Sequence, residues 1–136
     1  MNKQTAQNKT ILIAEDEPDL LQVLVDKFTL EGFNVLGAVN GEEGLRIALE
    51  KHPDLILLDL IMPVMDGLTM LKKLREDEWG KQVEVIILTN LSDAPIVAQA
   101  VEQKSFDFLV KSDWKLADVV KRVREKLGIN DPSTKF

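Results

Sequence analysis

The stretch LILLDLIMPVMDG, residues 55–67, decides the fold of this chain. It begins with a short apolar run, Leu55 to Leu58, of the kind that is typical of a buried strand. Asp59 then places a carboxylate where this strand meets its loop, which is a costly position for a charge unless a nearby group compensates it. Asp66 and Gly67 open the next helix. The segment therefore predicts a buried strand, a loop that begins with a functional carboxylate, and a helix.

Five short apolar runs alternate with segments that predict helices. Between the first two runs, apolar residues repeat at helical spacing, with Pro18 suited to the first turn of a helix and Gly32 to its end. Asn40 and Glu43 resemble a capping box for a second helix that continues through Lys51. Further helices are predicted from Asp66, from Ser92 and over residues 116–127, and the apolar runs are residues 11–14, 35–39, 55–58, 83–88 and 106–110.

This alternation predicts an α/β fold. Continuous apolar strands joined by helices are typical of a parallel sheet covered on both faces, that is, of a doubly wound three-layer sandwich. No hairpin signal interrupts the order of strands and helices. The chain of 136 residues is long enough for one well-buried core but not for two. We therefore expect one domain over residues 10–128, a disordered N-terminal segment over 1–9 and a tail over 129–136.

The composition excludes several kinds of site. The chain has no cysteine, which rules out disulfides, thiolate metal ligands and thiol nucleophiles. His52 is the single histidine, so zinc sites and serine–histidine catalysis lack their residues. The net charge of −6 weighs against a general nucleic-acid surface. Basic residues gather late in the chain, and we interpret them as a solvated helix face rather than a DNA-binding stripe. They are Lys115, Lys121, Arg122, Arg124 and Lys126.

No stretch of the sequence approaches the roughly 20 apolar residues of a membrane span. The first residues, Met1 to Lys9, are polar and lack the apolar region of a secretion signal. We therefore expect a cytoplasmic protein without membrane insertion and without direct contact to nucleic acid.

Charged and polar groups follow four of the predicted strands at their carboxyl ends. Glu15 and Asp16 follow the first strand, Asp59 the third, Thr89 the fourth and Lys111 the fifth. In a parallel sheet of this kind, ligands bind outside the carboxyl ends of the strands. Three carboxylates at close range repel one another unless a cation joins them. Oxygen ligands without histidine or cysteine, with few carboxylates and open water positions, suit Mg²⁺ better than Ca²⁺.

The other two strand-end residues indicate phosphate chemistry. Lys111 can pair with a carboxylate or a phosphate oxygen, and the Thr89 hydroxyl can donate to the same oxygen. With a cation, these groups fit a carboxylate nucleophile that takes a phosphoryl group. Taken alone, Asp59 could equally be a turn residue or a helix cap, and the acids after the first strand could simply belong to a helix N-terminus. Thr89 alone could be an ordinary strand residue, and Lys111 alone could be a solvated side chain. Their conjunction at one edge of one sheet favours the functional interpretation.

These residues resemble the receiver domain of two-component response regulators. The resemblance implies a flavodoxin-like (βα)5 fold with strand order 2-1-3-4-5, and a signalling switch rather than an enzyme. By this resemblance, Asp59 accepts a phosphoryl group from the phosphohistidine of a sensor histidine kinase or phosphotransfer protein. The resemblance covers about Thr10 to Leu127 and is carried by residues 11–18, 57–67, 88–89 and 108–111, including the specific motif Asp-x-x-Met-Pro-x-x-Asp-Gly from Asp59 to Gly67.

The resemblance also implies a magnesium site around the phosphoacceptor. Asp16 would bind Mg²⁺ directly and Glu15 would do so through water. The Asp59 carboxylate and the backbone carbonyl of Ile61 would complete the protein ligands.

The resemblance further implies a conformational switch. Thr89 and Lys111 would hold the phosphoryl oxygens, and Phe108 would turn inward when Thr89 moves. The changed surface would be the fourth helix, the fifth strand and the fifth helix, and it would regulate a downstream partner protein. The chain would act as a monomer or as a homodimer promoted by phosphorylation.

Three positions depart from the family pattern. Ser112 stands where a proline, often after a cis bond, is common, and a cis bond before serine would cost about 3 kcal/mol. Asn90 stands where a small residue is usual, and Glu15 replaces the commoner aspartate. Ile61 and Leu91 flank the expected site with apolar side chains. We hypothesise that they hinder the attacking water and lengthen the lifetime of the phosphoryl group.

Other functions fit the sequence less well or remain open. A scaffold with this fold that is never phosphorylated would not need Asp59, Asp16 and Lys111. A haloacid-dehalogenase-like phosphatase would need a second acid where Ile61 stands, and neither Gly-x-x-x-x-Gly-Lys nor Gly-x-Gly-x-x-Gly occurs for a nucleotide. We interpret the chain as a stand-alone receiver, with a fragment of a larger DNA-binding regulator as the alternative.

Overall fold

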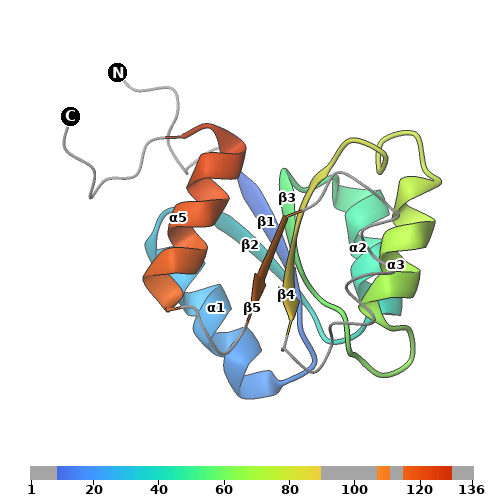
Figure 1. Ribbon diagram of the computed structural model, residues 1–136, viewed down its shortest axis with the longest axis horizontal. Coiled ribbons are helices and arrows are strands. Elements are labelled where there is room, and N and C mark those ends of the chain that lie inside the picture. The colour runs from blue at the N-terminus through green and yellow to red at the C-terminus, as the bar shows by residue number, and fades with distance from the viewer. Residues whose placement is uncertain (1–8, 90–106, 111–114, 130–136) are drawn as a thin grey trace.

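Five parallel strands form a single sheet, as the sequence pattern predicts, in the order β2-β1-β3-β4-β5 that the resemblance implies (Figure 1). The computed structural model describes residues 9–89, 107–110 and 115–129. Each strand lies close to the apolar run that predicted it, and β2 lies at an edge of the sheet. The strands are β1 (Thr10–Ala14), β2 (Asn34–Ala38), β3 (Leu55–Asp59), β4 (Glu84–Thr89) and β5 (Asp107–Val110).

Helices cover both faces of this sheet. Figure 1 shows α1 and α5 on one side and α2 and α3 on the other. The fourth helix predicted from Ser92 lies outside the described residues. In the described ranges, no helix is long and apolar enough to cross a membrane. The helices are α1 (Pro18–Leu30), α2 (Gly41–Lys51), α3 (Gly67–Arg75) and α5 (Leu116–Leu127).

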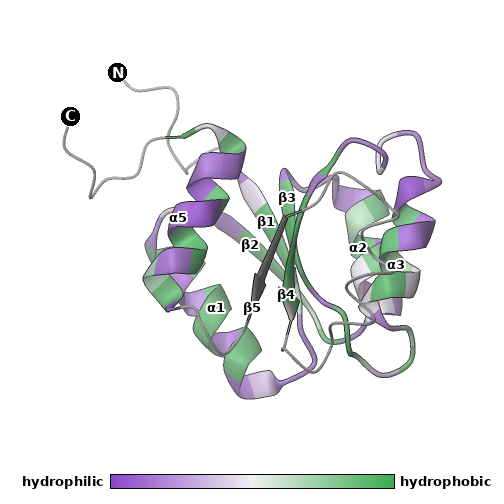
Figure 2. Ribbon diagram, in the orientation of Figure 1, coloured by the Kyte–Doolittle hydropathy of each residue, from purple (hydrophilic) through white to green (hydrophobic). Residues whose placement is uncertain are grey.

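Two apolar clusters fill the spaces between the sheet and its helices. Alternate residues of a strand face opposite sides, so Ile11 and Ile13 of β1 join the cluster under α1 and α5, whereas Leu12 joins the cluster under α2 and α3. All five residues of β3 are buried. Figure 2 shows β1, β3 and β4 as largely hydrophobic and the helices as two-sided, with polar residues along part of each. This two-faced burial is the reason why the strands are continuous apolar runs.

The helices begin at the residues that predicted their starts. Pro18 is the first residue of α1, and Asp66 caps α3 with Oδ1 accepting from the Thr69 amide at 2.8 Å. Asn40 Oδ1 accepts from the Glu43 amide at 2.8 Å, which is half of the predicted capping box. The other half is displaced by one residue, because the Glu43 carboxylate accepts from the amide of Val39, the residue before the cap, at 3.0 Å.

The prediction of a solvated basic face on the last helix is wrong for Arg124. This side chain is only 4% exposed. Its Nη2 donates to the backbone carbonyl and to Oε1 of Glu31, both at 3.2 Å, and its guanidinium lies 5.3 Å from the centre of the Phe33 ring. Arg124 therefore ties α5 to the end of α1. Lys115 and Lys121 are exposed, as predicted.

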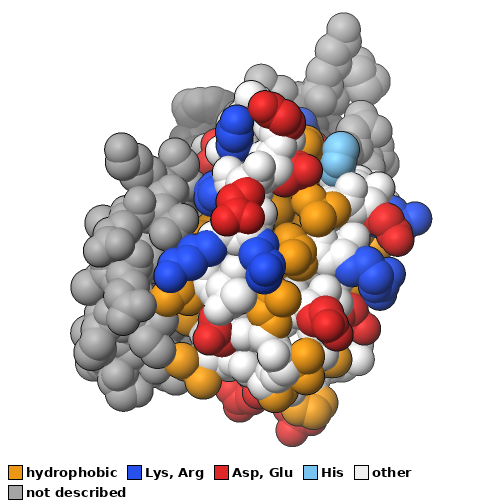
Figure 3. Space-filling model, turned by 90° about the vertical axis from the view of Figure 1, so that its right-hand side faces the viewer, with side chains coloured by type: hydrophobic (Ala, Val, Ile, Leu, Met, Phe, Trp, Pro, Cys, Tyr) orange, Lys and Arg blue, Asp and Glu red, His pale blue; other side chains and the backbone are white. Residues whose placement is uncertain are grey.

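The side of the molecule formed by α2 and α3 carries charges of both signs scattered among apolar side chains (Figure 3). On this side Trp79 is half-buried and stacks on His52, with ring centres 4.3 Å apart and planes inclined by 7°. Arg75 donates to the carbonyls of Gly80 and Val83 at 2.6 and 2.9 Å. Burial lowers the pKa of the Arg75 guanidinium, and the nearby Glu84 carboxylate opposes that shift. These contacts fix the loop between α3 and β4, which leads into the amino end of β4, whereas the predicted site lies at the carboxyl ends of the strands.

Candidate functional site

The register of the sheet brings the predicted strand-end residues to one edge. Ala14 of β1 pairs with Leu58 of β3, so the residues that follow, Glu15 and Asp59, come next in neighbouring strands. Asp59 in turn pairs with Leu88, which places the backbone of Thr89 one position beyond it on β4. The parallel arrangement alone therefore gathers residues that are far apart in the sequence.

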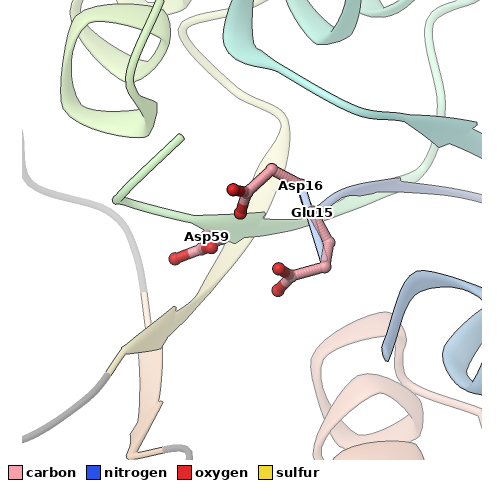
Figure 4. A group of neighbouring side chains, drawn as sticks. All are labelled: Glu15, Asp16 and Asp59. Carbon is pink, nitrogen blue, oxygen red and sulfur yellow. The ribbon is translucent and has the colours of Figure 1, made fainter. Parts of the chain in front are cut away.

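Three carboxylates meet at this edge. One oxygen each from Glu15, Asp16 and Asp59 lies within 4.8 Å of the others. Glu15 is fully buried, Asp59 is 4% exposed and Asp16 is half-buried. Figure 4 shows Glu15 and Asp16 leaving the end of β1 and Asp59 leaving β3, with the three carboxylates turned to the same side. The prediction that these three acids converge is confirmed.

Backbone amides fix the orientation of the two buried acids. The Glu15 amide donates to the Ala38 carbonyl at 3.0 Å, which holds Glu15 beside the end of β2. The Glu17 amide donates to Glu15 Oε2 at 3.0 Å, and the Ile61 amide donates to Asp59 Oδ1 at 3.1 Å. Hydrogen bonds of this kind stabilise a buried carboxylate without neutralising it. These hydrogen bonds thus hold the two side chains in a fixed geometry.

Gly67 is a site residue whose role the sequence analysis missed. Its amide donates to the Leu60 carbonyl at 2.9 Å, closing the loop between β3 and α3. A Cβ at this position would run into the carbonyl oxygen of Asp59. Gly41 makes a second close approach, since its amide donates to the Met65 carbonyl at 2.8 Å and a Cβ would meet the same oxygen. The Asp66-Gly67 pair predicted a helix start, but nothing in the sequence predicted the close approach of Gly67 to the Asp59 carbonyl.

The other predicted site residues are only partly described. Ile61 is 47% exposed in the loop after β3. Thr89 ends β4 and Phe108 lies in β5, but the structure describes only their backbone. Lys111, Asn90, Leu91 and Ser112 lie outside the described residues, so their predicted roles stay predictions.

The donor set suits a hard divalent cation. All three side chains offer carboxylate oxygens, which are the ligands that Mg²⁺ takes in proteins, usually with several waters kept in its coordination sphere. Burying the charges of Glu15 and Asp59 is costly unless an opposite charge joins them. A Mg²⁺ ion held by Glu15, Asp16 and Asp59 would supply that charge.

Comparison with known proteins points to one family. The family described as response regulator receiver domain matches residues 11–124. The transcriptional regulatory protein PrrA of Mycobacterium tuberculosis is 38% identical over 86% of this chain and 49% of its own length. The DNA-binding dual master transcriptional regulator RpaA of a Synechocystis species is 33% identical over 89% of this chain and 50% of its own length.

A solved structure supports the same relationship. The receiver domain of the sensor histidine kinase PA1611 from Pseudomonas aeruginosa, determined with a magnesium ion coordinated in its active-site cleft, is 27% identical with a TM-score of 0.80. The similarity covers 88% of this chain and 98% of that one. The chain spans about half the length of the two curated relatives, PrrA and RpaA, but nearly the whole of this single receiver domain.

Proposed function

Because this chain belongs to the response regulator receiver domain family, we propose that Asp59 is the residue on which it accepts a phosphoryl group. Receiver domains act in phosphorylation-dependent signalling and are not enzymes of the ordinary kind. The observation that carries the proposal is the place of Asp59, at the carboxyl edge of the sheet with carboxylate oxygens of Glu15 and Asp16 within 4.8 Å. A helix cap or a solvated turn residue would not need this buried acidic surrounding.

The proposed reaction is transfer from a phosphohistidine. A carboxylate oxygen of Asp59 attacks phosphorus, the new P–O bond forms as the P–N bond breaks, and the imidazole of the donor leaves. The Ile61 amide holds the attacking carboxylate in place through Oδ1. Glu15 and Asp16 repel an incoming phosphoryl group by themselves, so their negative charges are compatible with transfer only when a cation is present.

We assign the cation site to Glu15, Asp16, Asp59 and the Ile61 carbonyl. Asp16 would bind the ion directly and Glu15 would do so through water, as the resemblance implies. When bound, Mg²⁺ supplies the positive charge that the phosphoryl oxygens require. The half-buried position of Asp16 supports its role, because it leaves that carboxylate at the border of the solvent.

The proposed output is a change of surface. Thr89 and Lys111 hold the phosphoryl oxygens, and Phe108 turns inward, so that phosphorylation favours one of two conformations of the face that includes β5 and α5. The donor is a sensor histidine kinase or a phosphotransfer protein, in the cytoplasm. Because PrrA and RpaA are named as transcriptional regulators, an effect on transcription through a DNA-binding domain or partner is the output that the relatives support.

Intact mass spectrometry tests the phosphoacceptor. The parent protein incubated with acetyl phosphate and Mg²⁺ should gain one phosphoryl group, and the gain should disappear with EDTA or in Asp59→Asn. The matched control is Asp66→Asn, which removes an exposed carboxylate from the same loop and should keep the adduct. An adduct that persists in Asp59→Asn would contradict the assignment. No adduct in the parent would favour a scaffold that is not phosphorylated.

A further inference from the structure

The loop that follows Asp59 contains a strained residue, Val64. In the described residues, only His52 and Val64 combine a side chain with a positive φ. His52 ends α2, where the left-handed conformation is ordinary. Val64 has φ 68°, which is a true outlier for a β-branched residue. The Met65 amide donates to the Pro63 carbonyl at 2.7 Å, so the three residues form a tight γ-turn of the rare, positive-φ kind.

Packing does not offset this strain. The Val64 side chain is 76% exposed, and the preceding Pro63 is exposed as well. Glycine has no Cβ to clash in this conformation, and asparagine tolerates it far better than valine. A residue that is strained without gaining burial is held there by the backbone around it. Strain of this sort concentrates at functional sites.

Backbone hydrogen bonds on both sides of the turn anchor the loop that also contacts Asp59. The Met65 carbonyl accepts from the Gly41 amide at 2.8 Å, and the Gly67 amide closes the loop on Leu60 at 2.9 Å. At the start of the same loop, the Ile61 amide holds Asp59 Oδ1. The γ-turn therefore reverses the chain between two anchored points, and the segment that it stiffens includes Ile61.

We propose that Val64 is a positioning residue, whose strained turn holds the Ile61 backbone and, through it, the Asp59 carboxylate in the arrangement that receives a divalent cation. This inference rests on the proposed function. A loop with glycine at position 64 would sample more conformations and would have to be ordered when the cation binds. The strain at Val64 thus lowers the stability of the protein, whereas the narrow conformational range of a residue with a Cβ at this position improves the affinity of the site for the cation.

Two substitutions separate strain from stiffness. Val64→Gly removes both the strain and the stiffness of the turn. Val64→Asn removes most of the strain but retains a Cβ and a narrower range of backbone conformations. Leu30→Ala is the control, because Leu30 is an apolar residue, 85% exposed, at the far end of α1. Thermal unfolding in EDTA and calorimetric titration with Mg²⁺ are measured for all four proteins.

The proposal predicts that both substitutions raise the stability but that only Val64→Gly weakens the binding of Mg²⁺. In EDTA, Val64→Gly and Val64→Asn should raise the Tm by about 3 °C, because they relieve the positive-φ valine. The Mg²⁺ dissociation constant should rise about tenfold in Val64→Gly, as for the loss of a group that supports metal ligands, and stay near the parent value in Val64→Asn. Leu30→Ala should change neither.

Three results in the variants would overturn the inference. Parent-like Mg²⁺ affinity in Val64→Gly would show that the turn does not position the site. A lower Tm of Val64→Gly in EDTA would show that the valine is not strained. Equal loss of affinity in Val64→Gly and Val64→Asn would place the effect in the valine side chain instead of the turn. A parent protein that binds no Mg²⁺ would overturn the proposed cation site as well, so the two failures are distinguishable.

Discussion

Replacing Asp59 by asparagine is expected to stabilise the metal-free protein. Asp59 is 4% exposed, and one of its oxygens lies within 4.8 Å of oxygens of Glu15 and Asp16. Coulomb's law gives a repulsion of about 3 kcal/mol for one pair of unit charges at this separation, with an effective dielectric constant of about 20. The substitution removes the charge that takes part in two of these repulsions and keeps the shape of the side chain.

Two corrections reduce the expected gain. Asp16 is half-buried, so water and salt screen its repulsion with Asp59, and the pair with the fully buried Glu15 dominates. Asparagine also weakens the hydrogen bond from the Ile61 amide, because an amide oxygen replaces a carboxylate, at a cost of about 1 kcal/mol. The net stabilisation is about 2 kcal/mol, which corresponds to an increase in Tm of about 6 °C for a domain of this size.

Thermal and urea unfolding in EDTA measure this difference, and added Mg²⁺ provides a second signature. A cation that binds the folded parent stabilises it by about 2.7 kcal/mol at 100 times its dissociation constant. The variant lacks one ligand and gains less, so the order of stability should reverse in Mg²⁺. Asp66→Asn is the control, since Asp66 is exposed and asparagine caps a helix equally well. A lower stability of Asp59→Asn in EDTA would refute the view that the three acids repel.

Three further substitutions test other contacts. Arg124→Ala should lower the free energy of unfolding by about 3 kcal/mol in urea, because it removes a buried guanidinium bonded to Glu31; a loss below about 1 kcal/mol would mean that the contact is incidental. Gly67→Ala should cost about 3 kcal/mol and lower phosphoryl incorporation, because its Cβ meets the Asp59 carbonyl; unchanged incorporation would contradict this. Ile61→Gln should shorten the half-life of the phosphoryl group about threefold, equal to about 0.7 kcal/mol in the barrier to hydrolysis, if the half-exposed isoleucine hinders water; an unchanged half-life in timed mass spectra would count against that hypothesis.

The fold and the acidic cluster were predictable because both follow from local patterns. Apolar runs such as Leu55 to Leu58 mark strands buried on both faces, and buried strands of that kind occur in parallel sheets. Once the strands are parallel, the residues after them meet at one edge whatever their distance in sequence. The convergence of Glu15, Asp16 and Asp59 needed no further information.

The contacts that escaped prediction depend on tertiary packing. Arg124 has the sequence surroundings of a solvated helix residue, and only the approach of α5 to Glu31 and Phe33 makes it buried. The close approach of Gly67 to the Asp59 carbonyl depends on the path of a loop. Val64 shows the same limit more sharply, because its sequence position after proline carried no signal of a positive φ. Helical periodicity and strand propensity do not describe such contacts.

The features that lower the stability of this fold are concentrated at the edge of the sheet where the phosphoryl transfer is proposed. Two apolar clusters stabilise the sheet from both faces, whereas the carboxyl edge combines three mutually close acids with a strained Val64. Both features depend on the same short loop, since Asp59 begins it and the Ile61 amide joins the Asp59 carboxylate to it. A cation at this edge would relieve the repulsion and use the order that the stiff turn at Val64 imposes. Folding and cation binding should therefore be coupled through residues 59–67, and the coupling should weaken whenever either the charge of Asp59 or the turn at Val64 is removed.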